Sequence, residues 1–438
     1  MKSRIDRYSD YKDSGVKWVG KIPKHWSVKK LGNLLNPVSI KNQPDLPLLS
    51  ITREKGVILR DLDNEEENHN FIPDDLSNYK VIRKGQFGMN KIKAWQGSYG
   101  ISEYDGIVSP AYFIFDLDSD VVENFFHSAI RSRLYVSFFG SASDGVRVGQ
   151  WDLSKPRMRE IPFLVPPKEE QTAIAQFLDR KTAQIDKAIA QKEKIIELLE
   201  ERRQILIHKA VTRGLNPNVK LKPSGVEWIG EIPEHWEVKR LGYLANCFPS
   251  NVDKHVRPNE KMVRLCNYTD VYKNDFISDD MELMESTASK DQIEKFALKK
   301  GDIIITKDSE TANDIAVPAY VSQQLTNVVC GYHLAVIRPY SEIFGLYLFR
   351  AFQCKIYNIQ FELCSNGITR VGLGVSDLKR GNFLLPPLEE QRRISDFIEE
   401  QLPKYSEAIS RSQSEIEKLK EYKATLINSA VTGKIKVF

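Results

Sequence analysis

The chain has 438 residues, of which 41% are hydrophobic, 10% aromatic and 28% charged, and this composition is typical of globular domains rather than disordered or fibrous chains. At about 100–200 residues per domain, the length predicts two to four domains. The net charge of +4 is too small to indicate a partner by itself.

We expect no membrane span and no secretory signal, because no run of about 18 apolar residues occurs and residues 1–7 lack an apolar core. The five cysteines contain no Cys-x-x-Cys pair, which disfavours a disulfide scaffold or a zinc site. These features predict a cytoplasmic protein.

The chain contains one frame twice. Residues 11–32 and 221–242 share 14 identities in 22 positions. A second repeated block starts at residue 161 and again near residue 382, and each copy closes with Ala-Val-Thr. Plain duplication followed by drift remains an alternative, but drift should affect the whole unit. Here the frame is kept while the middles diverge, which favours two variable modules on one repeated scaffold.

These blocks predict four parts of the chain. The expected boundaries are a variable domain over 1–160, a helical part over 161–214, a second variable domain over 215–380 and a second helical part over 381–438.

The variable modules are predicted to consist mainly of strands and turns. Strand pairs are expected over 81–90 and 106–115 in the first module, and over 296–306 and 328–338 in the second. The two modules therefore should share a fold while their surfaces differ.

Nucleic-acid-binding domains are usually basic. The variable modules are not, since residues 33–150 carry a net charge of −4 and residues 243–378 carry a net charge of −3. Binding there would depend on local clusters. The candidate DNA-binding residues are Lys91, Lys93, Trp95, Arg147, Lys307, Asp308 and Arg370. Each has a plainer alternative as a solvated turn or a contact within the scaffold, and for any single residue we favour that alternative.

The helical parts carry the 3.5-residue spacing of coiled coils, since apolar positions step alternately by four and three and no Gly or Pro occurs between Lys168 and Thr212. Both seams become polar at the same two steps, Lys192 with Ser412 and Arg203 with Lys423. This agreement predicts two long helices that pack in register. Two helices that each pack on their own domain are the alternative. The predicted seam residues are Leu178, Ile185, Ile189, Ile196, Leu199, Leu206, Ile398, Tyr405, Ile409, Ile416, Leu419 and Leu426.

Pro403 lies near the start of the second helical part and predicts a break or a first-turn position there.

Catalytic motifs are missing from the sequence. No phosphate-binding P-loop occurs, and neither Pro-Pro pair follows Asn or Asp as in amino-methyltransferases. The acidic run at Asp116, Asp118 and Asp120 lacks the Gly and the closing Glu of a calcium loop. We therefore predict a non-catalytic chain without a metal site.

These motifs resemble those of the specificity subunits of type I restriction-modification systems. The resemblance rests on Trp-x-Gly-x-Ile-Pro-x-His-Trp-x-Val-x-x-Leu-Gly at 18–32 and 228–242, and on Pro-Pro-x-Glu-Glu-Gln at 166–171 and 386–391. It covers the whole chain in the expected order, twice.

The resemblance implies an α+β fold in which two globular mixed α/β target recognition domains are joined by two long antiparallel coiled-coil helices, with an internal pseudo-two-fold repeat. Each domain would read one half of a bipartite, asymmetric site in double-stranded DNA. The helices would set the spacer length and dock two methyltransferase subunits. The translocase-nuclease subunits would join them in the full complex, and no membrane is involved.

The same resemblance assigns the chemistry to the partners. S-adenosylmethionine would be bound by the methyltransferase subunit and ATP with Mg²⁺ by the translocase, so this chain is expected to bind no cofactor. Three alternatives stay open. They are an enzyme in its own right, a coiled-coil adaptor without nucleic acid, and the equivalent subunit of a related system whose restriction and modification activities share one polypeptide partner.

Overall fold

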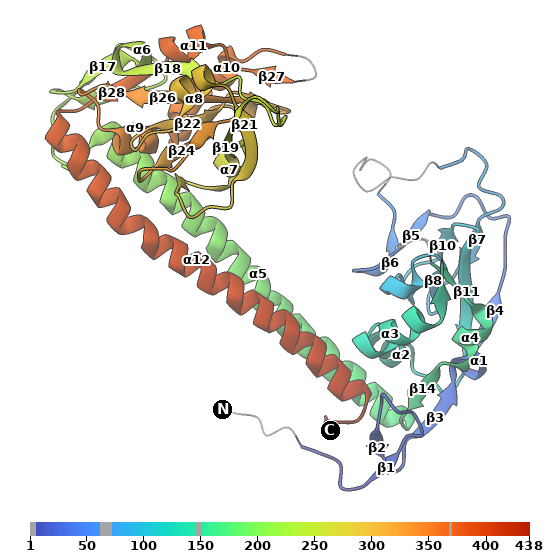
Figure 1. Ribbon diagram of the computed structural model, residues 1–438. Helices are drawn as coiled ribbons and strands as arrows, with labels where there is room; N and C mark the ends of the chain where they lie inside the picture. The colour runs from blue at the N-terminus through green and yellow to red at the C-terminus, as the bar shows by residue number, and fades with distance from the viewer. Residues whose placement is uncertain (1–5, 62–71, 146–150, 368–369) are drawn as a thin grey trace. The chain divides into compact units, whose positions relative to one another are not determined.

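The computed structural model describes residues 6–61, 72–145, 151–367 and 370–438. The chain forms two compact units, unit 1 with residues 1–193 and 413–438, and unit 2 with residues 194–412. Each unit combines one globular domain with parts of two long helices (Figure 1). The predicted α+β fold class, two mixed α/β domains on a pair of long helices, is confirmed.

The globular part of unit 1, called domain 1, runs from β1 to β14. Its central sheet has the strand order β4-β11-β8-β9, and all three pairings are antiparallel. Its elements are β1 (Tyr11–Asp13), β2 (Lys21–Pro23), β3 (Ser27–Lys30), α1 (Leu31–Leu34), β4 (Leu35–Val38), β5 (Leu49–Thr52), β6 (Gly56–Leu59), β7 (Lys80–Ile82), β8 (Phe87–Asn90), η1 (Ala94–Gln96), β9 (Tyr99–Ile101), β10 (Gly106–Val108), β11 (Tyr112–Leu117), α2 (Glu123–Ile130), α3 (Arg133–Ser141), β12 (Ser143–Asp144), β13 (Asp152–Leu153), α4 (Lys155–Glu160) and β14 (Pro162–Val165).

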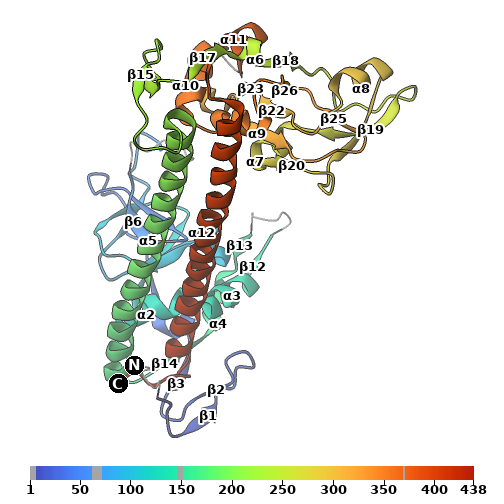
Figure 2. The ribbon, with the colours of Figure 1, turned by 90° about the vertical axis from the view of Figure 1, so that its left-hand side faces the viewer.

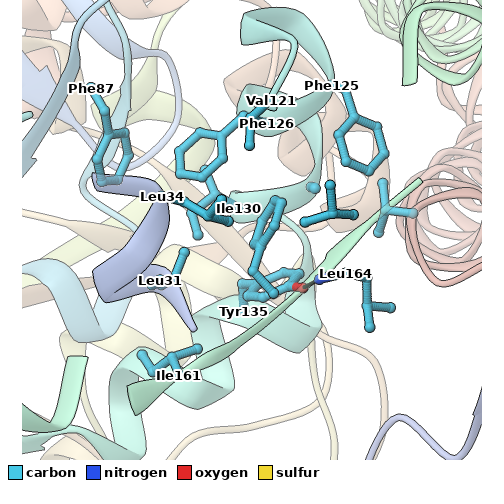
Figure 3. Close-up of a cluster of buried hydrophobic side chains, with 14 of the residues drawn as sticks. Leu31, Leu34, Phe87, Val121, Phe125, Phe126, Ile130, Tyr135, Ile161 and Leu164 are labelled. Carbon is cyan, nitrogen blue, oxygen red and sulfur yellow. Dashed lines mark hydrogen bonds between the residues drawn. The ribbon is translucent and has the colours of Figure 1, made fainter. Parts of the chain in front are cut away.

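Aromatic side chains fill the core of domain 1. Phe126 packs edge-on against Phe87 with ring centroids 5.2 Å apart (Figure 3). The ring centroid of Tyr135 lies 5.0 Å from that of Phe163. The Tyr135 hydroxyl accepts a hydrogen bond from the Leu164 amide at 3.1 Å, which satisfies both polar groups in the apolar interior. The core therefore ties α2 and α3 to the strand that leads into the first long helix.

The globular part of unit 2, called domain 2, runs from β15 to β28. It contains a five-stranded sheet with the order β18-β26-β22-β24-β20 and a three-stranded sheet with the order β21-β19-β25. Its elements are β15 (Leu221–Pro223), β16 (Glu231–Pro233), β17 (Glu237–Arg240), α6 (Leu241–Leu244), β18 (Ala245–Pro249), β19 (Lys261–Cys266), α7 (Tyr268–Lys273), β20 (Phe276–Ile277), β21 (Met284–Ala288), α8 (Lys290–Phe296), β22 (Ile303–Thr306), β23 (Asp308–Ser309), η2 (Ala312–Asp314), β24 (Pro318–Val321), β25 (Val328–Cys330), β26 (Leu334–Pro339), α9 (Gly345–Phe352), α10 (Lys355–Cys364), β27 (Val371–Gly372), α11 (Val375–Arg380) and β28 (Asn382–Leu385).

The strand pair expected over 296–306 is wrong in its first half. Phe296 ends α8, and only Ile303–Thr306 forms a strand there. Ser289 and Gln292 form a capping box that starts this helix, a local signal that the strand pattern concealed.

The two long helices are α5 (Lys168–Arg213) and α12 (Leu388–Val431), which have 46 and 44 residues. They run side by side, as Figures 1 and 2 show. In unit 1, Lys423 bonds to Asp186 at 2.6 Å and Lys192 to Glu415 at 2.5 Å. From Asp186 to Lys192, α5 advances by six residues, while the partners on α12 go back by eight residues, from Lys423 to Glu415. The two helices are therefore antiparallel.

The break expected at Pro403 is wrong, because α12 continues through this residue. A proline inside a helix removes one backbone hydrogen bond and costs about 3 kcal/mol. Ile398 and Leu402, which precede Pro403 on the same helix, are buried in the core of unit 2 and offset that cost. Tertiary packing therefore overrides the local signal.

The repeated frame joins each domain to the start of its long helix. Glu170 accepts hydrogen bonds from His25 Nε2 at 2.6 Å and from Trp26 Nε1 at 2.8 Å. Gln171 is fully buried; its Oε1 accepts from the Val122 amide at 2.7 Å, and its Nε2 donates to the carbonyls of Pro166 and Asp120.

The second copy repeats these bonds. Glu390 accepts from His235 and Trp236, while Gln391 accepts from the Phe344 amide at 2.7 Å. The Pro-Pro-x-Glu-Glu-Gln motif thus fixes the first helix turn to the domain, and α2 occupies in domain 1 the place that α9 occupies in domain 2.

Candidate nucleic-acid interface

Lys91 and Lys307 occupy equivalent places in the two domains. Lys91 follows β8 and Lys307 follows β22, and the carbonyl oxygen of each accepts from a buried leucine amide, Leu153 at 3.2 Å and Leu373 at 2.8 Å. Each leucine precedes a short helix of the repeated frame, α4 or α11. The frame therefore presents a lysine at the same point of both domains.

In domain 2, Lys307 belongs to a polar group that we call the β23 cluster, made of Lys307, Asp308, Tyr332, His333 and Arg370. Lys307 Nζ lies 2.9 Å from both carboxylate oxygens of Asp308. His333 Nδ1 lies 2.9 Å from Asp308 Oδ2 on the other side. A single carboxylate thus holds two cationic or potentially cationic groups near the surface.

Asp308 is ionised in this arrangement. Burial alone would raise the pKa of Asp308, but the hydrogen bonds from Lys307 and His333 outweigh it and lower the pKa below its usual value. An ionised carboxylate can only accept hydrogen bonds, so His333 carries its proton on Nδ1 and its Nε2 is left as an acceptor when the ring is neutral.

The backbone at His333 is strained, with φ at +73°, a region that non-glycine residues rarely adopt. The preceding Tyr332 is 51% exposed, and its ring centroid lies 3.7 Å from that of His333. The tight turn between β25 and β26 thus presents an aromatic ring beside the Asp308 carboxylate.

Arg370 joins the cluster through backbone pairing. It is exposed and directly precedes β27, whose residues pair with β23 as Ser309 with Val371 and Asp308 with Gly372. The structure therefore brings Lys307, Asp308 and Arg370 to one two-stranded ladder, although they are about 60 residues apart in sequence.

A pair of tyrosines borders the cluster. Tyr268 and Tyr272 of α7 stack with ring centroids 5.6 Å apart and planes 14° from parallel. The Tyr268 hydroxyl lies 3.2 Å from Ser309 Oγ, and the Tyr272 hydroxyl donates to Asp314 at 2.9 Å. Aromatic faces next to basic side chains are typical of surfaces that contact nucleic acids.

In domain 1, Lys91 Nζ pairs with Asp152 at 3.0 Å, and the side chain of Trp95 lies against Trp151 with ring centroids 5.0 Å apart. Lys93 is exposed on the same segment. Arg147, the remaining candidate, lies outside the described residues. The domains therefore present lysines beside aromatic rings at the same point of the frame, but with different neighbours.

A cavity of about 570 Å³ in domain 1 adjoins Lys93. Its lining includes Asn90, Gln96, Ser98 and Tyr112.

The predicted seam residues lie on the faces of α5 and α12 that are removed from solvent. Five of them are buried: Leu178, Ile185, Ile398, Ile416 and Leu426. The other seven are half-buried: Ile189, Ile196, Leu199, Leu206, Tyr405, Ile409 and Leu419. Off the seam, Ile195 and Leu198 are more than 40% exposed.

The polar side chains within the seam form hydrogen bonds or ion pairs with residues next to it. Lys192 and Lys423 pair with carboxylates of the facing helix, and the Ser412 hydroxyl donates to the Ala408 carbonyl at 2.9 Å. Arg203 bonds to Asp275 of domain 2 at 2.9 Å.

Sequence reasoning missed several members of the two surfaces, namely Tyr332, His333, Tyr268 and Trp151. Their contacts depend on the sheet register, which residue types alone do not reveal. A Tyr-His pair directly after a glycine, between two expected strands, was the available signal for Tyr332 and His333.

Within the described ranges, no three or more His, Cys, Asp or Glu side chains come together as metal ligands would. No helix in the described part of the chain is long and apolar enough to span a bilayer.

Comparison with known proteins identifies relatives along the whole chain. Residues 233–418 match the family model described as type I restriction modification DNA specificity domain. Specificity subunits assigned to the MjaX and MjaVIII type I restriction enzymes of Methanocaldococcus jannaschii are each 22% identical, over 98% and 95% of this chain and 98% and 94% of theirs.

A chain solved in work on complex assembly and conformational transition of the type I R-M system shares the fold, with a TM-score of 0.69 at 15% identity over 94% of this chain and 98% of that one. The matched domain, the relatives that align from end to end and the common fold agree with one another. In sequence and in fold the chain is thus similar to the specificity subunits of type I restriction-modification systems, and residues 233–418 match their DNA specificity domain.

Proposed function

We propose that each globular domain reads one half of a bipartite, asymmetric DNA site, and that the two long helices set the distance between the halves. The observation that carries this proposal is the pair of equivalent lysines, Lys91 and Lys307, which one repeated frame presents among different neighbours. Two similar frames that carry different surfaces suit a subunit that reads two different sequences.

In this proposal, Lys307, Arg370 and Tyr332 contact DNA from domain 2, and Lys91, Lys93, Trp95 and Arg147 do so from domain 1. Lysine and arginine would position the phosphate backbone, while base choice would come from side chains that reach major-groove edges. Asp308 orients Lys307 and can itself accept from a cytosine amino group.

The partners supply what this chain does not. Two methyltransferase subunits dock on the helices and hold S-adenosylmethionine, translocase-nuclease subunits use ATP with Mg²⁺, and the complex works in the cytoplasm. The sequence supports this division because it contains neither a P-loop nor the Pro-Pro motif of amino-methyltransferases. The negative variable modules also favour a DNA channel that is completed by positive partner surfaces.

The proposal is tested by exchange of one module. Residues 33–150 are replaced by the corresponding segment of a relative, and the methylated bases are mapped in DNA from cells that hold this chain and its methyltransferase partner. We expect one half-site to change while the other half-site and the gap stay. A change in both half-sites would overturn the independent-reader model.

The spacer function is tested by length. Four residues are inserted in α5 after Glu200 and four in α12 after Ala408, which lies opposite when the antiparallel register of the ion pairs is extended. The insertion adds about 6 Å of helix, close to two base-pair steps of ~3.4 Å. We expect a longer gap with unchanged half-sites, and altered half-site bases at an unchanged gap would contradict the model.

A further inference from the structure

Domain 2 holds a buried cation at its junction with the long helices. Arg350 of α9 is 1% exposed, and its guanidinium bonds to Glu399 of α12 at 2.6 Å and to Gln353 at 2.5 Å. The rings of Phe276 and Phe349 lie against it, with centroids 5.4 and 4.8 Å away. Such a charge is retained in an apolar setting only with tightly placed partners.

Asp275 extends this contact to the other long helix. Its carboxylate lies 3.5 Å from Arg350 and accepts from Arg203 of α5 at 2.9 Å. The Asp275 carbonyl accepts from the Tyr320 amide of β24, which anchors the residue to the five-stranded sheet. Arg203, Asp275, Arg350 and Glu399 thus form a chain of alternating charges, called the junction network, that links domain 2 to both helices within unit 2.

Unit 1 has other residues at these places. Ser128 of α2 stands where α9 has Arg350, and Asp179 of α5 stands where α12 has Glu399. Burial raises the pKa of Asp179, which has no cationic partner among its described contacts. Lys423, the counterpart of Arg203, pairs with Asp186 on the facing helix and not with domain 1.

This difference has a mechanical consequence. Apolar packing is non-directional, so a domain held by it can rotate slightly at little cost. The junction network is directional, because the planar guanidinium accepts its carboxylate partners only in a fixed geometry. Buried ion pairs add little net stability, but they can specify one arrangement among several of similar energy.

We propose that Arg350, with Asp275, is a positioning residue that fixes the orientation of domain 2 on the helix pair and thereby the register of its half-site. The inference rests on the proposed function, since it concerns the gap that the helices set. Arg350 touches no DNA in this role; it acts through the domain that it holds.

The experiment uses the methyltransferase complex that contains the full chain. Methyl transfer is measured on duplexes in which the mapped half-sites are separated by the native gap and by gaps one base pair shorter and longer. For Arg350→Met, we expect the preference in kcat/KM for the native gap to fall by about tenfold, the equivalent of ~1.4 kcal/mol, while half-site bases are unchanged.

Loss of Arg350 alone leaves the Glu399 carboxylate without its cation, so the single variant can fail to fold. The double variant Arg350→Met with Glu399→Met removes a matched pair and leaves Asp275 with Arg203. Replacement of a buried ion pair by apolar side chains is often neutral for stability. Its fold is checked by circular dichroism and its thermal transition, and the same loss of gap preference is expected.

Asp179→Asn is the matched control in unit 1, at the place of Glu399, and we expect the native gap preference to persist there. A folded double variant with undiminished gap preference would overturn the inference. So would an equal loss of preference in Asp179→Asn. If the unaltered complex shows no gap preference at all, the proposed spacer function fails instead, so the two failures are distinguishable.

Discussion

Trp26 donates its indole N–H to a carboxylate oxygen of Glu170 over 2.8 Å, and the two residues come from the two motifs that the chain contains twice. The same carboxylate accepts from His25 and from the Tyr8 hydroxyl, whose pKa is raised by burial and then by Glu170 itself. One acidic side chain thus organises the junction between domain 1 and α5.

Glu170→Ala is expected to destabilise unit 1 by about 3 kcal/mol, because it removes a charged acceptor and leaves the buried indole N–H unpaired. Glu390→Ala in unit 2 should cost less, about 2 kcal/mol, since Glu390 has two donors and its bond to Trp236 is longer at 3.2 Å. Urea unfolding of the full chain, followed by hydrogen exchange of peptides from each unit, measures both. The exposed neighbour Glu169→Ala should change stability by only about 0.5 kcal/mol. Equal effects of Glu169→Ala and Glu170→Ala would contradict this account.

Gly433→Ala tests the end of α12, which packs on the N-terminal hairpin. Gly433 has φ at +68°, and an added Cβ would lie 2.4 Å from Pro23 Cδ and 3.2 Å from the Trp26 ring. We expect a loss of roughly 2–4 kcal/mol from backbone strain and overlap together.

Gly15→Ala is its matched control, because Gly15 has nearly the same φ of +72° and nothing within 4 Å of an added Cβ. It should cost only the strain, about 1 kcal/mol. Thermal unfolding of both variants separates the two contributions. Similar shifts in Tm would mean that the contact with Pro23 carries no energy.

Much of this arrangement could be predicted from sequence, for a physical reason. The 3.5-residue spacing of Leu178, Ile185 and their successors reports which helix face avoids water, and repeated motifs report repeated contacts. Neither pattern indicates which residues from distant parts of the sequence contact each other. The bond of Asp308 to His333 depends on sheet register and a strained turn, and the junction of Arg350 with Asp275 depends on where a loop returns. The helix break expected at Pro403 is absent because local helix propensity is weaker than the packing of Ile398 and Leu402.

The stability of unit 1 should depend on pH through His127. Burial, with a smaller contribution from Arg131, lowers the pKa of His127 from 6.5 to about 4, and its Nδ1 accepts from the Ile101 amide at 3.2 Å. In the unfolded chain His127 binds a proton near pH 6.5, whereas in the folded chain it binds the proton only near pH 4. The stabilisation is therefore complete above pH 6.5 and is lost as the pH falls toward 4, by about 3 kcal/mol in all.

His127→Asn keeps an acceptor close to Nδ1 but does not titrate. Its free energy of unfolding should be lower at pH 7.5 and should change less between pH 6.5 and 4.5. Urea unfolding across this range provides the measurement, and the same slope in the variant and in the unaltered chain would assign the pH dependence to other groups.

Opposite charge changes at the β23 cluster should affect DNA binding in opposite directions. Lys307→Met removes one cation, so the complex should bind DNA more weakly and the slope of log K against log salt should decrease in magnitude by about one.

Asp308→Asn leaves Lys307 in place and removes the carboxylate that now neutralises it. Binding to any DNA should then strengthen, while the preference for the specific site should fall because Lys307 and His333 lose the group that orients them. Both quantities are measured by fluorescence anisotropy of the methyltransferase complex with specific and unrelated duplexes, at salt concentrations between about 50 and 200 mM. If Lys307 serves only to hold Asp308 within the fold, both variants should weaken binding through lost structure and the salt slope should not move. The opposite signs therefore distinguish a lysine that meets phosphate from one that only supports its neighbour.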